Sequence, residues 1–261
     1  MDLLRELTLS LRSYADAIRF IDQHKLWKLL IIPALCSLII ACFVGWFAWK
    51  TSAAVTDFAV VKFNLDSSYS YMNTFLEFIV FTFIRLIIIF SYIKLYRYLL
   101  LIILAPEFSY IISVVQSKAT DARHEFKIRR FIFDVWRSIK LSIRNFLIEL
   151  ILTLLIIVFG VIVTWLIPII PILLLLFEGY FFGYSLADFR NEFMNLRPRE
   201  SKDLINGHKG LVISHGIVFN ISLLIPIIGI LFSPTISIIA MGLSLNELEE
   251  KSENYYASSV S

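Results

Sequence analysis

Positive charge in this chain is concentrated in four segments that flank long apolar runs. Segments 1–28, 105–145, 188–210 and 246–261 carry five, eight, five and one basic residues, nineteen of the 24 Lys and Arg. The segment between the first two apolar runs, residues 50–74, has only Lys50 and Lys62. Because excess Lys and Arg marks the cytoplasmic face of a membrane, this distribution predicts a multi-pass protein with both termini in the cytoplasm.

The composition supports a membrane protein and argues against a soluble enzyme. The chain is 58% hydrophobic with a mean hydropathy of +0.78, which exceeds the need of a soluble core of 261 residues. No nucleotide-binding, hydrolase or metal motif occurs, and the two cysteines, Cys36 and Cys42, lie within one apolar run. We therefore expect no enzymatic activity, no cofactor and no metal. No cleavable signal peptide is expected at the N-terminus.

The first 104 residues predict an interfacial helix and two long spans. Residues 1–24 have an apolar face at helical spacing, formed by Leu4, Leu7, Leu11, Tyr14, Ile18 and Ile21. The first span is expected over 29–49, with Trp46 and Trp49 at the far interface, followed by a polar loop over 50–74. The second span is expected over 75–104, where Pro106 ends it.

Residues 106–144 are amphipathic and basic. Two apolar stripes are expected, one of Phe108, Ile111, Ile112 and Val115, the other of Ile128, Phe131, Ile132, Val135, Ile139 and Ile143. The charge comes from Arg129, Arg130, Arg137, Lys140 and Arg144. Such a patch can bind nucleic acid, anionic lipid or an anionic solute. Next to a bilayer, we favour lipid headgroups and expect no nucleic-acid partner.

The rest of the chain predicts two hairpins and a tail. The first hairpin covers 145–188 and turns at Pro168 and Pro171, where backbone groups need water, headgroups or protein. The second covers 211–245; its returning arm, 235–245, is only about 17 Å long, which predicts a re-entrant hairpin. The chain is expected to form one membrane domain over 1–248, with a polar, disordered cytoplasmic tail over 249–261.

Three stretches, in order, resemble one family of membrane proteins. They are Leu26–Pro33; Leu101–Phe108; and Phe177–Tyr184 continuing through Gly207–Gly210 to Leu224–Pro226 and Ser233–Pro234. Together they are similar to the CysZ sulfate-permease family and its relatives, the etoposide-induced membrane proteins. The resemblance implies an all-α integral membrane protein with two long transmembrane helices, two hairpins that penetrate partway, and interfacial amphipathic helices. It also implies a bacterial inner-membrane location, assembly as dimers or larger oligomers, and sulfate uptake.

The resemblance also implies an anion site just before the first span. The Gly-Leu-Arg-Arg stretch of the family becomes Lys25-Leu26-Trp27-Lys28 here. Lysine is a good point charge for an oxyanion but lacks the planar bidentate fork of arginine. Arg19, Lys25, Trp27 and Lys28 are therefore the candidate anion-binding residues, with topology-setting charges that hold lipid phosphates as the alternative.

Other candidates lie within the apolar segments. Arg85, Glu178 and Asn220 are polar residues expected at membrane depth, and an Arg85–Glu178 pair is a possible structural tie or part of a gated pathway. Gly179 and Gly183 are spaced for close helix packing, within one protomer or across a dimer. His208 and His215 share a helix face without a third ligand, so we expect no metal there.

These observations lead to one principal function and two alternatives. The first is passage of a small oxyanion, sulfate or a relative, without ATP hydrolysis. The second is a non-transport membrane scaffold whose amphipathic helices bind lipid or protein partners. The third, an intramembrane enzyme, rests only on scattered polar residues. The expected partners are therefore membrane lipids, an inorganic oxyanion and further copies of the chain.

Overall fold

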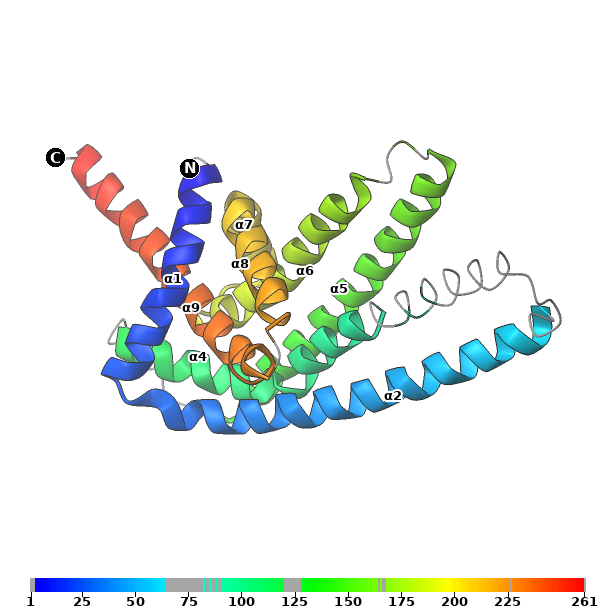
Figure 1. The fold of residues 1–261 in the computed structure, drawn as a ribbon. Helices are drawn as coiled ribbons and strands as arrows, with labels where there is room; N and C mark the ends of the chain where they lie inside the picture. The colour runs from blue at the N-terminus through cyan, green and yellow to red at the C-terminus, as the bar shows by residue number, and fades with distance from the viewer. Residues whose placement is uncertain are drawn as a thin grey trace. The chain divides into compact units, whose positions relative to one another are not determined.

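Regular secondary structure is entirely helical in the residues that the computed structural model describes, namely 3–63, 82, 85, 88, 91–119, 128–163, 165, 168–225 and 227–260 (Figure 1). The labelled elements are α1 Leu3–Gln23, η1 Leu26–Leu30, α2 Ile31–Phe63, α4 Ala105–Ala119, α5 Ile128–Ile162, α6 Ile170–Phe193, α7 Pro198–Gly207, α8 Lys209–Ser222 and α9 Ile228–Val260. Segments Leu26–Val55, Val135–Gly160, Ile170–Phe193 and Ile228–Lys251 are long and apolar enough to cross a bilayer. The chain is an all-α, multi-pass integral membrane protein, as its composition predicts.

The chain divides into two compact units, Met1–Ser37 with Leu101–Ser261, and Leu38–Leu100. In the second unit the predicted loop over 50–74 is wrong for residues 50–63, which continue α2. No Gly or Pro interrupts this stretch, so the helix persists after the apolar run ends. A hydrogen bond of 2.6 Å joins the hydroxyls of Thr51 and Tyr92.

The predicted second span, 75–104, lies mostly outside the described residues. Residues 82, 85, 88 and 91–103 are helical, and the helix breaks at Leu104. The break agrees with the predicted end at 104, and Pro106 stands in the first turn of the next helix, α4, where its missing N–H costs little. The predicted stripe of α4 is confirmed, because Phe108, Ile111, Ile112 and Val115 are all buried.

α1 is a helix as predicted, but its buried face only partly coincides with the predicted apolar face, with Ile21 in both. Leu11 and Ile18, from the predicted apolar face, are exposed. The buried face consists of Glu6, Leu9, Ser10, Ser13, Ala17 and Ile21. Small side chains on this face allow α1 to lie against α8 and α9, and the larger apolar side chains are left to face outward.

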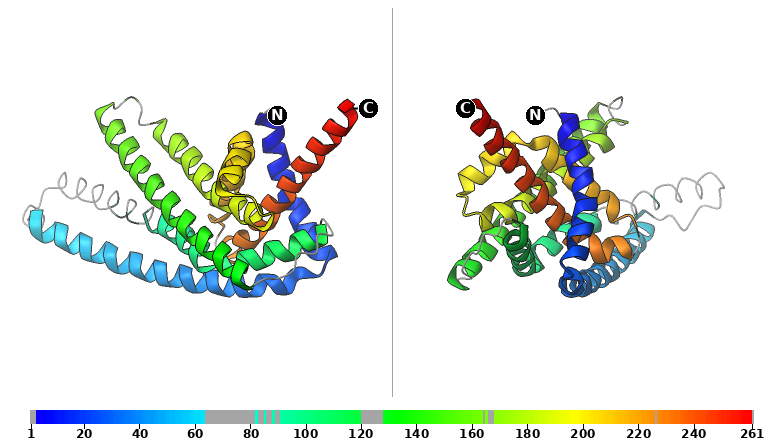
Figure 2. Two further views of the ribbon diagram at one scale, coloured as in Figure 1. Left: turned by 180° about the vertical axis from the view of Figure 1, so that it is seen from behind. Right: turned by 90° about the vertical axis from the view of Figure 1, so that its left-hand side faces the viewer.

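α5 and α6 form the first hairpin and lie side by side in both Figure 1 and Figure 2. The predicted boundary at residue 145 is wrong: α5 runs without a break from Ile128 to Ile162. Ile132 and Ile143, from the predicted second stripe, are exposed rather than buried. At the tip, Pro171 lies in the first turn of α6, which a proline tolerates.

The second hairpin is asymmetric. Its rising arm α8 has 14 residues, about 21 Å, which is too short to cross a bilayer. Its returning arm was predicted to be 235–245, and this is wrong, because α9 has 33 residues and contains Pro234 within the helix. The expected polar tail is helical as far as Val260, and Asn246 makes side-chain contacts. The ends of α1 and α9 lie on the same side of their unit (Figure 2).

Glycines bring α6 and α8 into close contact. A Cβ on Gly183 would overlap the Val212 carbonyl, and a Cβ on Gly216 would overlap the backbone of Gly179. A Cβ on Gly179 itself would lie 2.8 Å from the Ile213 carbonyl oxygen. Gly179 and Gly183 thus face α8 of the same chain, the helix on which α6 packs most extensively.

We expect Gly183→Ala to destabilise the protein by about 1–3 kcal/mol or more, because a methyl group on Gly183 would force α6 and α8 apart. Thermal unfolding of the purified chain in detergent measures this. Gly45→Ala is the matched control, since nothing lies within 4 Å of its added Cβ. In a helix interior alanine is favoured over glycine, so the control should be neutral or stabilising. Equal effects of the two changes would contradict the packing described.

Candidate functional site

The inner face of α5 carries a polar stripe. Ser138, Ser142, Asn145 and Glu149 follow one another at steps of four and three, and each is at most 2% exposed. The opposite face of the same helix is exposed, and it is apolar from Leu147 to Ile162. α5 therefore has the polarity of a lipid-embedded helix that turns its polar side chains toward protein.

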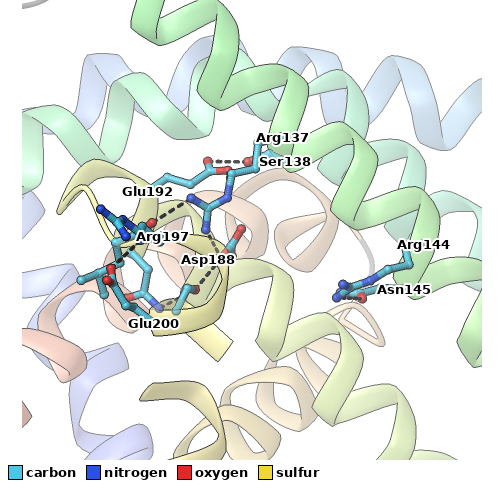
Figure 3. A network of polar contacts seen from close by, with 11 residues as sticks. Arg137, Ser138, Arg144, Asn145, Asp188, Glu192, Arg197 and Glu200 are labelled. Carbon is cyan, nitrogen blue, oxygen red and sulfur yellow. Dashed lines mark hydrogen bonds and ion pairs between the residues drawn. The ribbon is translucent and has the colours of Figure 1, made fainter. Parts of the chain in front are cut away.

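Arg137 is the centre of an ion-pair cluster between α5 and α6 (Figure 3). Its Nη2 lies 2.9 Å from Asp188 Oδ1 and its Nε lies 3.2 Å from Glu192 Oε1. Its Nη1 donates to the Leu196 carbonyl oxygen at 2.9 Å, and Ser138 Oγ donates to Glu192 Oε2 at 2.6 Å. Both carboxylates are less than 5% exposed, so the guanidinium compensates charges that water does not reach.

Hydroxyl and amide groups extend this cluster along α6 and into α7. Ser201 Oγ donates to Asp188 Oδ1 at 2.5 Å and accepts from Asn191 Nδ2 at 3.0 Å. On the other side, Asn145 Nδ2 donates to Ser185 Oγ at 3.1 Å. These contacts join α5, α6 and α7 into one hydrogen-bonded interior.

A second buried arginine ties α6 to α9. Arg190 is 1% exposed and donates to both carboxylate oxygens of Glu249, at 2.7 and 2.5 Å. It also donates to Asn246 Oδ1, and Asn246 Nδ2 donates to Gln116 Oε1 of α4 at 2.9 Å. The bidentate geometry gives a strong, directional contact that fixes the position of α9 against α6.

A smaller polar cluster surrounds His215 between α1, α8 and α9. Its Nε2 lies 3.0 Å from Ser244 Oγ and 3.5 Å from Ser13 Oγ. Each serine hydroxyl donates to a backbone carbonyl of its own helix, so the imidazole Nε2 is the donor to the serines. Tyr14 Oη donates to the His215 carbonyl oxygen at 3.0 Å. Burial raises the pKa of Tyr14, which keeps its phenol protonated as this hydrogen bond requires.

The predicted anion-binding residues lie together at the turn between α1 and α2. Lys25 has a positive φ of 53° and begins η1, and Lys28 lies in the last turn of η1, directly before α2. Trp27 Nε1 donates to Asp22 Oδ1 at 3.2 Å, and Arg19 lies 3.5 Å from Asp16 Oδ1. All four predicted residues are exposed. The 3₁₀ turn at the start of the apolar segment Leu26–Val55 therefore presents the two lysines.

The other predicted residues are dispersed. Glu178 is half-buried in α6 and Asn220 half-buried in α8, while Arg85 is exposed and helical. Arg85 belongs to the unit of residues 38–100 and Glu178 to the other unit, so their pairing stays a prediction. In the part of the chain that the structure describes, no three His, Cys, Asp or Glu residues form a metal site.

The sequence reasoning missed most of the buried network. Arg137 was assigned to a basic patch, Asp188 to the end of the first hairpin, and Arg190 and Glu192 to a hydrophilic cytoplasmic segment. One signal was available: the polar residues from Ser138 to Glu149 recur at helical spacing within an apolar run. A polar stripe of this kind on a lipid-facing helix has to face inward.

Helices of membrane-spanning length, together with a buried polar interior between α5, α6, α7 and α9, are typical of multi-pass membrane proteins such as transporters and channels. Residues 13–234 match the family described as sulfate transporter CysZ/etoposide-induced protein 2.4, and the chain belongs to this family. No curated protein matches the chain.

We expect Arg137→Gln to cost roughly 3–5 kcal/mol of stability, because it leaves two carboxylates buried without their cation. Thermal or denaturant unfolding in detergent measures the loss. Arg12→Gln is the control: its side chain is 70% exposed, and its contact with Asp16 should contribute at most about 1 kcal/mol. A loss for Arg137→Gln no greater than for Arg12→Gln would show that the cluster does not support the fold.

Proposed function

We propose that this protein passes a small oxyanion, sulfate or a related ion, across the membrane without ATP hydrolysis. Membership of the sulfate transporter CysZ/etoposide-induced protein 2.4 family supports transport as the class of activity. The family description names sulfate, and the residues of this chain support an oxyanion more broadly. We also propose that the protein works as a homo-oligomer in the bacterial inner membrane, with both termini in the cytoplasm.

The observation that carries this proposal is the state of Lys25 and Lys28. Both lysines are exposed, and neither has an ion-pair partner among the described residues. Asp22, the carboxylate nearest in sequence, accepts from the indole of Trp27 instead. By contrast, Arg137 and Arg190 are already paired with carboxylates of the protein. The two lysines therefore retain the positive field that attracts an oxyanion.

The local fold keeps this charge in place. Leu26 and Leu30 of η1 are buried, at 8% and 2% exposure, and the positive φ of Lys25 turns the chain sharply after α1. Because the leucines anchor the turn, Lys25, Trp27 and Lys28 point away from the packed interior. Flexible ammonium groups at such a position suit brief capture and release better than tight binding.

Sulfate flux into proteoliposomes tests the proposal. We expect the double variant Lys25→Gln with Lys28→Gln to lower the initial flux at low salt by at least about tenfold, because steering by local positive charge is lost. The control, Lys202→Gln with Lys209→Gln, removes two exposed lysines elsewhere in the same unit and should retain the flux.

Two results would count against transport. If the folded, correctly oriented protein passes none of sulfate, sulfite, thiosulfate and phosphate, the scaffold function replaces it. If flux occurs but the Lys25 and Lys28 variant matches its control, transport stands and these lysines only set topology.

A further inference from the structure

One face of α5 forms a continuous exposed stripe that no described element covers. We define the outer stripe of α5 as Phe133, Trp136, Lys140, Arg144, Leu147, Ile151, Leu154, Val158 and Ile162. Successive members are three or four residues apart, so they share one side of the helix. The inner face, with Ser138, Ser142, Asn145 and Glu149, lies opposite. The outer stripe is therefore the surface that α5 offers to its surroundings.

Measured from its two cations to Ile162, the outer stripe has the length of a bilayer core. From Arg144 to Ile162 the helix rises about 27 Å, and from Lys140 to Ile162 about 33 Å. The hydrocarbon core is about 30 Å thick. When Ile162 lies at one edge of that core, Lys140 and Arg144 lie at the other edge, among the headgroups. Trp165, which is 75% exposed just beyond Ile162, is suited to the opposite interface.

No carboxylate of the described residues neutralises the two cations of the outer stripe. Lys140 has no ion-pair partner in the described ranges, and Arg144 lies 3.2 Å from Asn145 Oδ1 and contacts Tyr184, whose ring centroid is 5.9 Å away. Arg137, in the same basic segment, turns inward to two carboxylates (Figure 3). Of these three cations, Arg137 is structural, whereas Lys140 and Arg144 lie on the exposed face of α5.

An indole completes the site. Trp136 is 66% exposed and precedes Lys140 by one turn on the same stripe. Indoles prefer the headgroup layer, where the ring contacts glycerol and upper acyl carbons. The order along the helix is then indole, two cations and an uninterrupted apolar stripe, which matches the chemistry of an anionic phospholipid from headgroup to acyl chain.

We propose that Trp136, Lys140 and Arg144 form a binding site for the phosphate headgroup of an anionic phospholipid, whose acyl chains lie along the outer stripe from Leu147 to Ile162. Lys140 and Arg144 donate to the phosphate oxygens. A phospholipid is the occupant, rather than a free oxyanion, because the apolar stripe begins directly beside the cations. The site lies on α5 and is separate from the lysines at the turn before α2.

Lipid titration of the full chain tests this site. The delipidated protein in a neutral detergent is titrated with dioleoyl phosphatidylglycerol or dioleoyl phosphatidylcholine, and the unfolding midpoint gives an apparent Kd. We expect phosphatidylglycerol to bind more tightly than phosphatidylcholine. Lys140→Gln should raise the apparent Kd for phosphatidylglycerol about fivefold. Lys140→Gln with Arg144→Gln should raise it roughly 25-fold, since each cation contributes a similar factor near an anionic surface.

The matched control is Lys202→Gln with Arg199→Gln, which removes the same two residue types from the exposed surface of α7 and should bind phosphatidylglycerol like the unmodified chain. If the double α5 variant does not fold, the single variant Lys140→Gln is used to test the proposal. This substitution breaks no ion pair with the described residues. Equal binding of the two lipids, or equal effects of the α5 and α7 variants, would overturn the proposal. A stabilisation by inorganic phosphate alone that the α5 variant abolishes would also overturn it, in favour of a free-anion site.

Discussion

Lipid offers no hydrogen bonds to polar side chains, and this constraint sets the orientation of α5 in the structure. Ser138, Ser142, Asn145 and Glu149 lie on one face of a helix whose other face is apolar from Leu147 to Ile162, over about 23 Å. Turning that polar face inward requires partners inside the protein. α6 supplies them, because Ser185 accepts from Asn145 and Glu192 accepts from Ser138. α5 therefore turns its polar side chains toward α6, because the side chains on its outer face have to be compatible with lipid.

α6 can supply these hydrogen-bond partners because its two halves differ in burial. Its first half exposes Ile172 and Phe177, whereas its second half is buried on all sides. Burial there depends on the close approach of α8, which Gly179, Gly183 and Gly216 permit. Ion pairs in such an interior stabilise the fold only when every charge has its partner, and Arg137 and Arg190 meet that requirement with carboxylates of α6 and α9.

Hydropathy and charge were sufficient to predict an all-helical membrane protein, the hairpin turn at Pro168 and the buried stripe of α4. They misjudged helix ends at 49, 145 and 245, because a helix continues past its apolar run when nothing in the sequence stops it. The buried network was harder to predict. Asp188 and Arg190 look like surface residues in the sequence, and only the folded arrangement places Arg137 and Asn246 against them.

Buried and exposed cations consequently have different chemical capacities in this protein. A guanidinium held by carboxylates has little field left for a mobile anion, so Arg137 and Arg190 determine shape rather than attraction. Lys25 and Lys28 stand on the exposed turn before α2, and no carboxylate of the described residues pairs with them. Lys140 stands at the end of the exposed apolar stripe of α5, which suits an anion that carries acyl chains. The charge that remains uncompensated, rather than the total charge, therefore determines where an anion can bind in this protein.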